Sequence, residues 1–77
     1  MDAKLKLFYD READILHIDR ISPYSQQESE ELEDGVVARM NPETNEIENL
    51  EVLFFSTRLP RSNGFELPVL ANFRLAG

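Results

Sequence analysis

Short runs of alternating polar and apolar residues, separated by turn-forming residues, constrain the fold of this chain more than any other feature. The first run, residues 4–9, has a period of two and places Leu5, Leu7 and Tyr9 on one face. This alternation is typical of a half-buried β-strand, because successive side chains of a strand point to opposite faces. The polar residues 10–14 that follow predict a turn.

Three further β-rich runs come after this turn. Residues 15–21 carry apolar side chains on both faces, which indicates a strand that is central in the sheet or covered on both sides. Residues 36–40 and 47–55 predict two more strands, and the Asn-Pro-Glu-Thr-Asn-Glu segment over residues 41–46 predicts a tight hairpin between them. The apolar parity of the last run shifts once, which predicts a β-bulge near residues 48–49.

Three segments leave alternatives open. Residues 25–34 are fair helix formers without an apolar stripe, so we interpret them as an extended acidic edge segment, with a helix as the alternative. A serine is expected to cap a short helical turn over residues 56–60, which a proline ends. Residues 65–75 alternate without a break and favour an extra strand, while a short helix beginning at Pro68 is the competitor.

Together these elements predict one mainly β (β-rich α+β) domain over residues 1–77. We expect a small antiparallel meander of four to five strands with one short helical turn near residues 56–60. A chain of 77 residues has a thin core and usually needs disulfides, a metal or oligomerisation for stability. The chain contains no cysteine and one histidine, so oligomerisation is the remedy that we expect.

Charge and hydrophobicity exclude several classes of partner. The chain has 15 acidic and 8 basic residues, for a formal net charge of −7. Because negative charge repels phosphate, no nucleic-acid partner is expected. No apolar run approaches the roughly 18–20 residues that span a bilayer, so we expect no membrane partner and a cytoplasmic location. The acidic residues 28–34 are interpreted as a solvated face or as a docking surface for a small basic protein.

Candidate chemistry is sparse. Asp10, Glu12 and Asp14 have the alternate spacing of a calcium loop, but the glycine and the glutamate that such a loop needs at its sixth and twelfth positions are both isoleucine. We therefore interpret Asp10 and Asp14 as caps of turn backbone amides. His17 is the only histidine, and no nucleophile is evidently paired with it. No catalytic, cofactor-binding or metal site is predicted, and no cofactor.

Three parts of the sequence resemble a known bacterial and archaeal family. Residues 9–18 resemble its opening signature, Tyr-Asp-x-Glu-Ala-Asp-x-Leu-x-Ile. Residues 30–37 resemble its acidic, glycine-containing middle, and residues 47–59 resemble its last strand and Ser-x-Arg-Leu ending. The chain thus resembles domain-of-unknown-function family 2283 over about residues 5–59, with a C-terminal extension over residues 60–77.

The resemblance implies a small sheet domain and no established catalytic activity. Some members of the family sit beside small toxin-like proteins, which implies an antitoxin role for those members. The leading hypothesis is an acidic protein-interaction module, as a homodimer or higher homo-oligomer, as an antitoxin-like partner of a basic protein, or both. The alternative is a small-ligand-binding domain or an unrecognised enzyme. Its candidate residues come from the family motif: Tyr9, Asp10, Glu12, Asp14 and His17.

Overall fold

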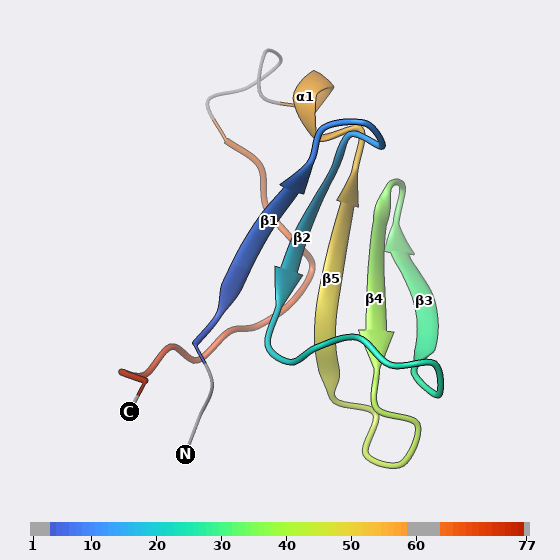
Figure 1. Cartoon of the computed structure of the whole chain (residues 1–77), viewed down its shortest axis with the longest axis vertical. Helices are drawn as coiled ribbons and strands as arrows, with labels where there is room; N and C mark the ends of the chain where they lie inside the picture. The colour runs from blue at the N-terminus through green and yellow to red at the C-terminus, as the bar shows by residue number, and fades with distance from the viewer. Residues whose placement is uncertain (1–3, 59–63, 77) are drawn as a thin grey trace.

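Five antiparallel strands form one sheet in the computed structural model, which describes residues 4–58 and 64–76 (Figure 1). One short helical turn follows the sheet, so the mainly β fold predicted from the sequence is confirmed. The elements in chain order are β1 (Lys6–Asp10), β2 (Ile15–Asp19), β3 (Glu28–Glu33), β4 (Val36–Met40), β5 (Ile47–Leu53) and α1 (Phe55–Arg58).

The strands follow the spatial order β1-β2-β5-β4-β3, which places β5 at the centre of the sheet. In a simple meander each strand would lie beside the next one in sequence, whereas here β2 pairs with β5. The connection from β2 to β3 therefore crosses the lower end of β5 and β4 (Figure 1). β5 suits the central place because Asn49, Leu50 and Val52 give it buried side chains on both faces.

The strand register assigns the side chains to two faces, because directly opposed residues point to the same side of a sheet. Leu50 of β5 lies opposite Ile18 of β2 and Ala38 of β4. We call this side the core face, and Leu7 and Tyr9 of β1 also belong to it. The buried apolar side chains all lie on the core face: Val36, Ala38, Leu50 and Val52. A core this small leaves the fold dependent on polar contacts as well.

The hairpin predicted over residues 41–46 and the β-bulge beside it are both confirmed. The side-chain oxygen of Asn41 accepts two backbone N–H groups of the turn, at 2.8 and 3.2 Å. Asn45 adopts a φ of 62°, the left-handed conformation that asparagine tolerates in tight loops. The register between β4 and β5 then skips Glu48, so the bulge lies within residues 48–49 as predicted.

The acidic segment over residues 25–34 contains the edge strand β3 and no helix, as the extended interpretation predicts. β3 pairs only with β4 within the described sheet. Its exposed side chains are one serine and four glutamates, and only Leu32 is half-buried. A helix of this composition would have no apolar stripe to pack on the core, whereas an edge strand needs only one covered side.

The short helical turn predicted over residues 56–60 is present as α1, although Pro60 lies outside the described residues. β5 ends before it because Phe54 takes a φ of 55°, which no strand can continue. The carbonyl of Phe54 accepts the backbone N–H and the hydroxyl of Thr57, at 3.1 and 2.8 Å. Within the described part of the chain, no helix has the length and apolar character needed to cross a membrane.

Residues 64–76, which we call the tail, form no regular element. The prediction of a strand over residues 65–75 is wrong, and a helix beginning at Pro68 does not form either. The backbone turns here, because the N–H of Val69 donates to the carbonyl of Leu67 at 2.8 Å. Pro68 has no backbone N–H, and the N–H of Val69 is already used in this turn. Neither residue can therefore donate a hydrogen bond to a neighbouring strand.

The tail crosses the sheet on the core-face side. It passes behind β1 and β2 in Figure 1, whereas the loop over residues 20–27 passes in front of β5 and β4. Its start is held by aromatic contacts, because the ring of Phe55 lies 5.6 Å from Tyr9 and 5.9 Å from Phe65, centroid to centroid. The first half of the tail thus adds to the covering of a single-layer sheet.

A buried amide fixes the loop on the opposite face. Asn49 is only 2% exposed, and its amide nitrogen donates to the Asp19 carboxylate at 2.9 Å and to the Ile21 carbonyl at 2.7 Å. Its amide oxygen accepts the side-chain N–H of Gln27 at 2.7 Å. Because every polar atom of this side chain is paired, the buried amide ties the loop over residues 20–27 to the centre of the sheet.

Gly35 provides a test of this architecture. It has a φ of 79°, and a Cβ there would collide with the Arg58 guanidinium. We expect Gly35→Ala to lower the free energy of unfolding by about 1–2 kcal/mol or more, because an L-residue is strained at that φ. Gly64→Ala is the matched control, since a Cβ at Gly64 meets no atom within 4 Å. Equal urea-unfolding midpoints for the two variants would contradict the assigned turn.

Candidate functional site

The family-like motif begins with a turn that Asp10 closes. One oxygen of its carboxylate accepts the backbone N–H groups of Glu12 at 3.1 Å and Ala13 at 3.2 Å. This is the cap that the sequence predicts for Asp10, and it sets the connection between β1 and β2. Asp14 completes the turn with a φ of 58°, a conformation that aspartate adopts more easily than most residues.

The carboxylate of Asp14 joins this turn to the end of β5. It accepts the Tyr9 hydroxyl at 2.7 Å, the Ser56 hydroxyl at 2.7 Å and the Ser56 backbone N–H at 2.9 Å. The Asp14 carbonyl also accepts the N–H of Phe55 at 3.2 Å. The prediction that Asp14 caps its own turn is therefore wrong, because its bonds reach across the sheet end. We call Tyr9, Asp14 and Ser56 the carboxylate clamp.

The pKa values of the clamp residues, like their geometry, indicate that the clamp stabilises the fold. Hydrogen bonds from Tyr9, and then from Ser56, lower the pKa of the Asp14 carboxyl below its usual value of 3.8. The bond to Asp14 raises the pKa of the Tyr9 hydroxyl above 10.0. Both groups are thereby held in their neutral-pH forms, a carboxylate acceptor and a phenol donor. Neither is poised to exchange a proton, which is what general acid–base catalysis needs.

Ser56 does not play the part expected of it. A helix cap should precede the first helical residue, but α1 begins at Phe55, so Ser56 lies inside the turn. Its hydroxyl is oriented toward Asp14 instead. No histidine or lysine bonds to that hydroxyl in the described structure, and a serine needs such a base to become a nucleophile.

Arg58 forms a second joint at the same end of the sheet. Its guanidinium donates to the carbonyl of Leu53 at 2.9 Å and to the carbonyl of Asp34 at 3.0 Å. It also lies over the ring of Phe65, 5.9 Å from the centroid. Arg58 thus connects the end of β5, the turn between β3 and β4, and the tail. Sequence reasoning missed this role, because all three contacts depend on the tertiary fold.

His17 lies apart from the clamp. The register places it between Phe8 and Glu51 on the opposite side of the sheet from Tyr9, a side that we call the polar face. Its Nδ1 is 3.7 Å from the Glu51 carboxylate, which also accepts the Arg39 guanidinium at 3.2 Å. The ring of Phe8 lies 5.7 Å away. His17 is therefore one member of a row of polar side chains, His17, Glu51 and Arg39, across three strands.

The five motif residues do not converge on a single site. Tyr9 and Asp14 meet in the clamp, Asp10 caps the adjacent backbone, and His17 lies on the other face. The carboxylate of Glu12 makes no hydrogen bond or ion pair in the described structure. The described residues also contain no group of three or more His, Cys, Asp or Glu side chains that could hold a metal ion.

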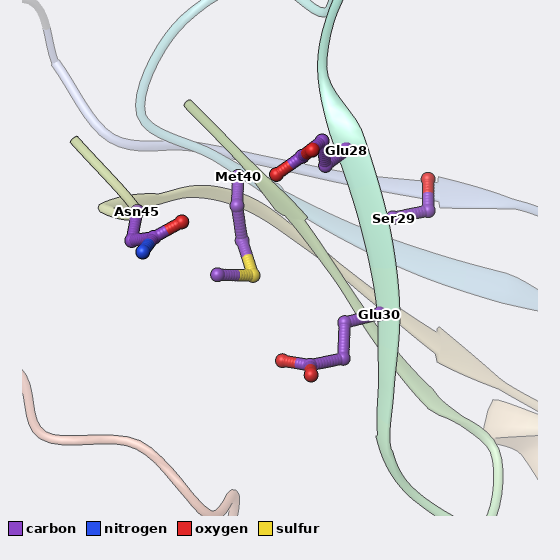
Figure 2. A pocket seen from close by; sticks show the side chains of 5 residues that line it. All are labelled: Glu28, Ser29, Glu30, Met40 and Asn45. Atoms are coloured by element: carbon purple, nitrogen blue, oxygen red, sulfur yellow. The ribbon is translucent and has the colours of Figure 1, made fainter. Parts of the chain in front are cut away.

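A different surface, at the start of β3, gathers charge around a shallow hollow. It is lined by Glu28, Ser29 and Glu30 of β3, with Met40 and Asn45 beside them. Figure 2 shows that Glu28 and Glu30 point to the same side as Met40, whereas Ser29 points away, as strand alternation requires. We call this surface the acidic edge. Its glutamates belong to residues 28–34, which the sequence predicts to be a solvated face or a docking surface.

The acidic edge combines two features that suit a basic, extended ligand. β3 is an outer strand of the sheet, so one row of its backbone N–H and C=O groups has no strand partner within the described residues. The carboxylates of Glu28 and Glu30 flank the thioether of Met40 (Figure 2). A lysine or arginine stem can lie on the thioether while its charged head meets the carboxylates.

The clamp predicts a specific dependence of stability on pH. Because the pKa of Asp14 is lower in the folded protein than its usual 3.8, its carboxylate stabilises the folded state above that pH, and this contribution is lost as pH falls through the folded-state pKa. We expect Asp14→Asn to lower the melting temperature at pH 7, with a gap to the natural chain that closes on acidification. Thermal melts by circular dichroism from pH 7 to pH 2 measure this gap.

Glu12→Gln is the matched control for Asp14→Asn, because it removes one charge from the same turn without breaking a contact. We expect it to melt close to the natural chain at every pH. If Asp14→Asn and Glu12→Gln had the same melting curve at neutral pH, the clamp would not contribute to stability.

Comparison with known proteins supports the family resemblance. The model of the family described as "Protein of unknown function (DUF2283)" matches residues 6–56. No curated protein and no solved structure matches the chain. The match covers all five strands and the first half of α1, including the clamp and excluding the tail. Since the match covers more than half of the sequence, the chain belongs to the DUF2283 family.

Proposed function

We propose that this domain is an acidic protein-interaction module that binds an extended, basic segment of a partner protein along β3. The observation that carries the proposal is the acidic edge. It lies on β3, an outer strand with glutamates at four of its six positions. The partner class is a small basic protein, consistent with the antitoxin role that the family resemblance implies for some members. The proposed location is the cytoplasm, whose reducing conditions suit a chain without cysteine.

Strand addition is the binding mode that this geometry favours. A partner strand beside β3 would satisfy the open row of backbone groups, and its side chains would alternate between the two faces of the sheet. On the core-face side they would meet Glu28 and Glu30, and on the other side Ser29 and Glu31. A strand with lysine or arginine at alternate positions therefore matches the first pair.

Main-chain bonds and charge have separate roles in this mode. Exposed ion pairs contribute little individually, because water and salt screen them. The backbone ladder would supply most of the affinity, while the glutamates select basic strands and repel acidic ones. The same negative charges keep β3 from pairing with β3 of another copy, which is how natural edge strands avoid aggregation.

Titration with short peptides tests the proposal. We expect an octapeptide of alternating lysine and valine to bind the natural chain, and to bind more weakly as salt is raised. At any one salt concentration, a peptide methylated at the backbone nitrogens along one edge should bind more weakly than the unmethylated peptide, because it lacks the donors that a ladder needs. Isothermal titration calorimetry of both peptides measures these differences.

Charge-matched variants separate the acidic edge from the general charge of the protein. Glu28→Gln with Glu30→Gln should weaken peptide binding and reduce its dependence on salt, whereas Glu12→Gln with Glu66→Gln should leave both unchanged, although both pairs remove two charges. Equal binding to both double variants would show that attraction is nonspecific. Equal binding of the methylated peptide would rule out strand addition.

A further inference from the structure

The chain exposes more surface than a compact protein of its size. Its accessible surface is 6206 Å² and its Cα radius of gyration is 13.0 Å. A compact monomer of 8.9 kDa exposes about 4800 Å², and a compact chain of 77 residues has a radius of gyration of about 11.5 Å. The excess of about 1400 Å² is larger than the roughly 800 Å² that each partner contributes to a standard protein interface.

Apolar side chains account for part of this surface, and they gather at β1 and the tail. Leu7 is 61% and Phe8 is 51% exposed, one on each face of β1. In the tail, Leu70 and Leu75 are completely exposed and Phe73 is 80% exposed. β1 is the second outer strand of the sheet, paired only with β2 among the described strands. Grouped apolar exposure of this kind marks an interaction surface.

We infer that β1 pairs with β1 of a second copy, antiparallel, about a two-fold axis that passes through Leu7. The interface extends the sheet at the edge opposite the acidic edge and does not depend on a basic partner. In this register Leu7 faces its own equivalent, and Leu5 faces Tyr9 of the second copy. Leu7 and Tyr9 lie on the core face, and continued strand alternation would place Leu5 there too, so the pairing would join two half-exposed apolar rows into one.

The charges of β1 match this register. With Leu7 on the axis, Lys4 faces Asp10 of the second copy, an opposite-charge pair at each end of the joined strands. On the polar face Lys6 faces Phe8 of the second copy. Within one chain the ammonium of Lys6 already lies 5.9 Å from the centroid of the Phe8 ring, the geometry of a cation–π contact. No like charges are directly opposed, and the one like-charged diagonal pair, Lys6 with Lys6 of the second copy, is offset by Asp10 of the second copy on the other diagonal of each Lys6.

The other edge cannot form the same kind of dimer. A two-fold pairing of β3 with β3 would place glutamates close to glutamates along the strand, because four of its six residues are glutamate. Like charges in opposed or diagonal cross-strand positions are destabilising. Of the two outer strands, β1 alone is therefore compatible with a symmetric sheet extension.

Pairing of β1 with β3 of a second copy would bring opposite charges together, but it would not pack apolar side chains against each other. Lysines would meet glutamates, but Leu5 and Leu7 would lie against a strand whose exposed residues are all polar. Such a head-to-tail contact also leaves one edge free at each end, so it would grow into open chains. The apolar match at β1 favours the closed two-fold dimer.

The tail extends toward the position that the second copy would occupy in this dimer. In Figure 1 the tail crosses behind β1 and β2 and ends beyond the β1 edge, on the side where the second copy would be. Because the core face continues across the two-fold axis, the end of the tail, which carries the exposed Leu70, Phe73 and Leu75, would lie on the core-face side of the joined sheet. These side chains contribute little to a monomer, in which they face solvent.

Mass measurement of charge variants tests the inference. Sedimentation equilibrium of the natural chain should give twice the 8.9 kDa monomer mass at micromolar concentration. Leu7→Lys places like charges on the axis and should give the monomer mass with an unchanged circular dichroism spectrum, since Leu7 is an exposed residue. Glu28→Gln with Glu30→Gln should remain dimeric. These variants also separate this interface from the proposed peptide site. Leu7→Lys should still bind the basic peptide, whereas Glu28→Gln with Glu30→Gln should bind it more weakly.

Cysteine cross-linking tests the register independently of any effect of lysine on folding. The natural chain has no cysteine, so Leu7→Cys introduces a single thiol at the axis, within the roughly 4.4–6.8 Å Cα separation that a disulfide requires. Mild oxidation should give a covalent dimer, whereas Ser29→Cys at the acidic edge should not. A monomeric natural chain, growth beyond the dimer, or equal cross-linking of the two variants would each overturn the inference.

Discussion

The fold depends on the pairing of β5 with both of its neighbours. β1 and β2 form one hairpin, β3 and β4 form another, and β5 is the strand that joins them. The polar contacts at the ends of the sheet reinforce this joint: the clamp ties the first hairpin to the residues after β5, and Arg58 ties the second. Asn49 does the same for the loop between them. The described residues include only four buried apolar side chains, and so small a core needs this support.

Local patterns predicted most of the elements because their causes are local. The strand over residues 36–40 and the hairpin after it follow from alternation and from the conformations that asparagine and proline prefer. The bulge follows from a parity break within one strand. The order of the strands has no such local cause. The strand order depends on which strand can be buried on both faces, and this can be decided only by comparing all five strands.

Two of the wrong predictions about local structure differ in cause, one being a contact distant in sequence and the other a local turn. Asp14 was expected to cap its own turn, but its partner Ser56 lies 42 residues away. The tail alternates as a strand would, yet its backbone turns at Pro68 and pairs with no strand among the described residues. The candidate site was partly predictable: the sequence showed the charge of residues 28–34, interpreted as a solvated face or a docking surface, while the place of Met40 beside two glutamates required the fold.

The two outer strands differ in charge, and the two proposed interactions follow that difference. Glutamates along β3 oppose self-association and leave an open backbone edge for a strand of opposite charge. β1 has balanced charges about Leu7 and apolar side chains on both faces, which suits an identical strand. An open five-stranded sheet would otherwise offer two equivalent edges for uncontrolled pairing. In the proposed dimer, pairing of β1 with its equivalent closes one edge, so two acidic edges would lie at the ends of the joined sheet and would form a bivalent surface.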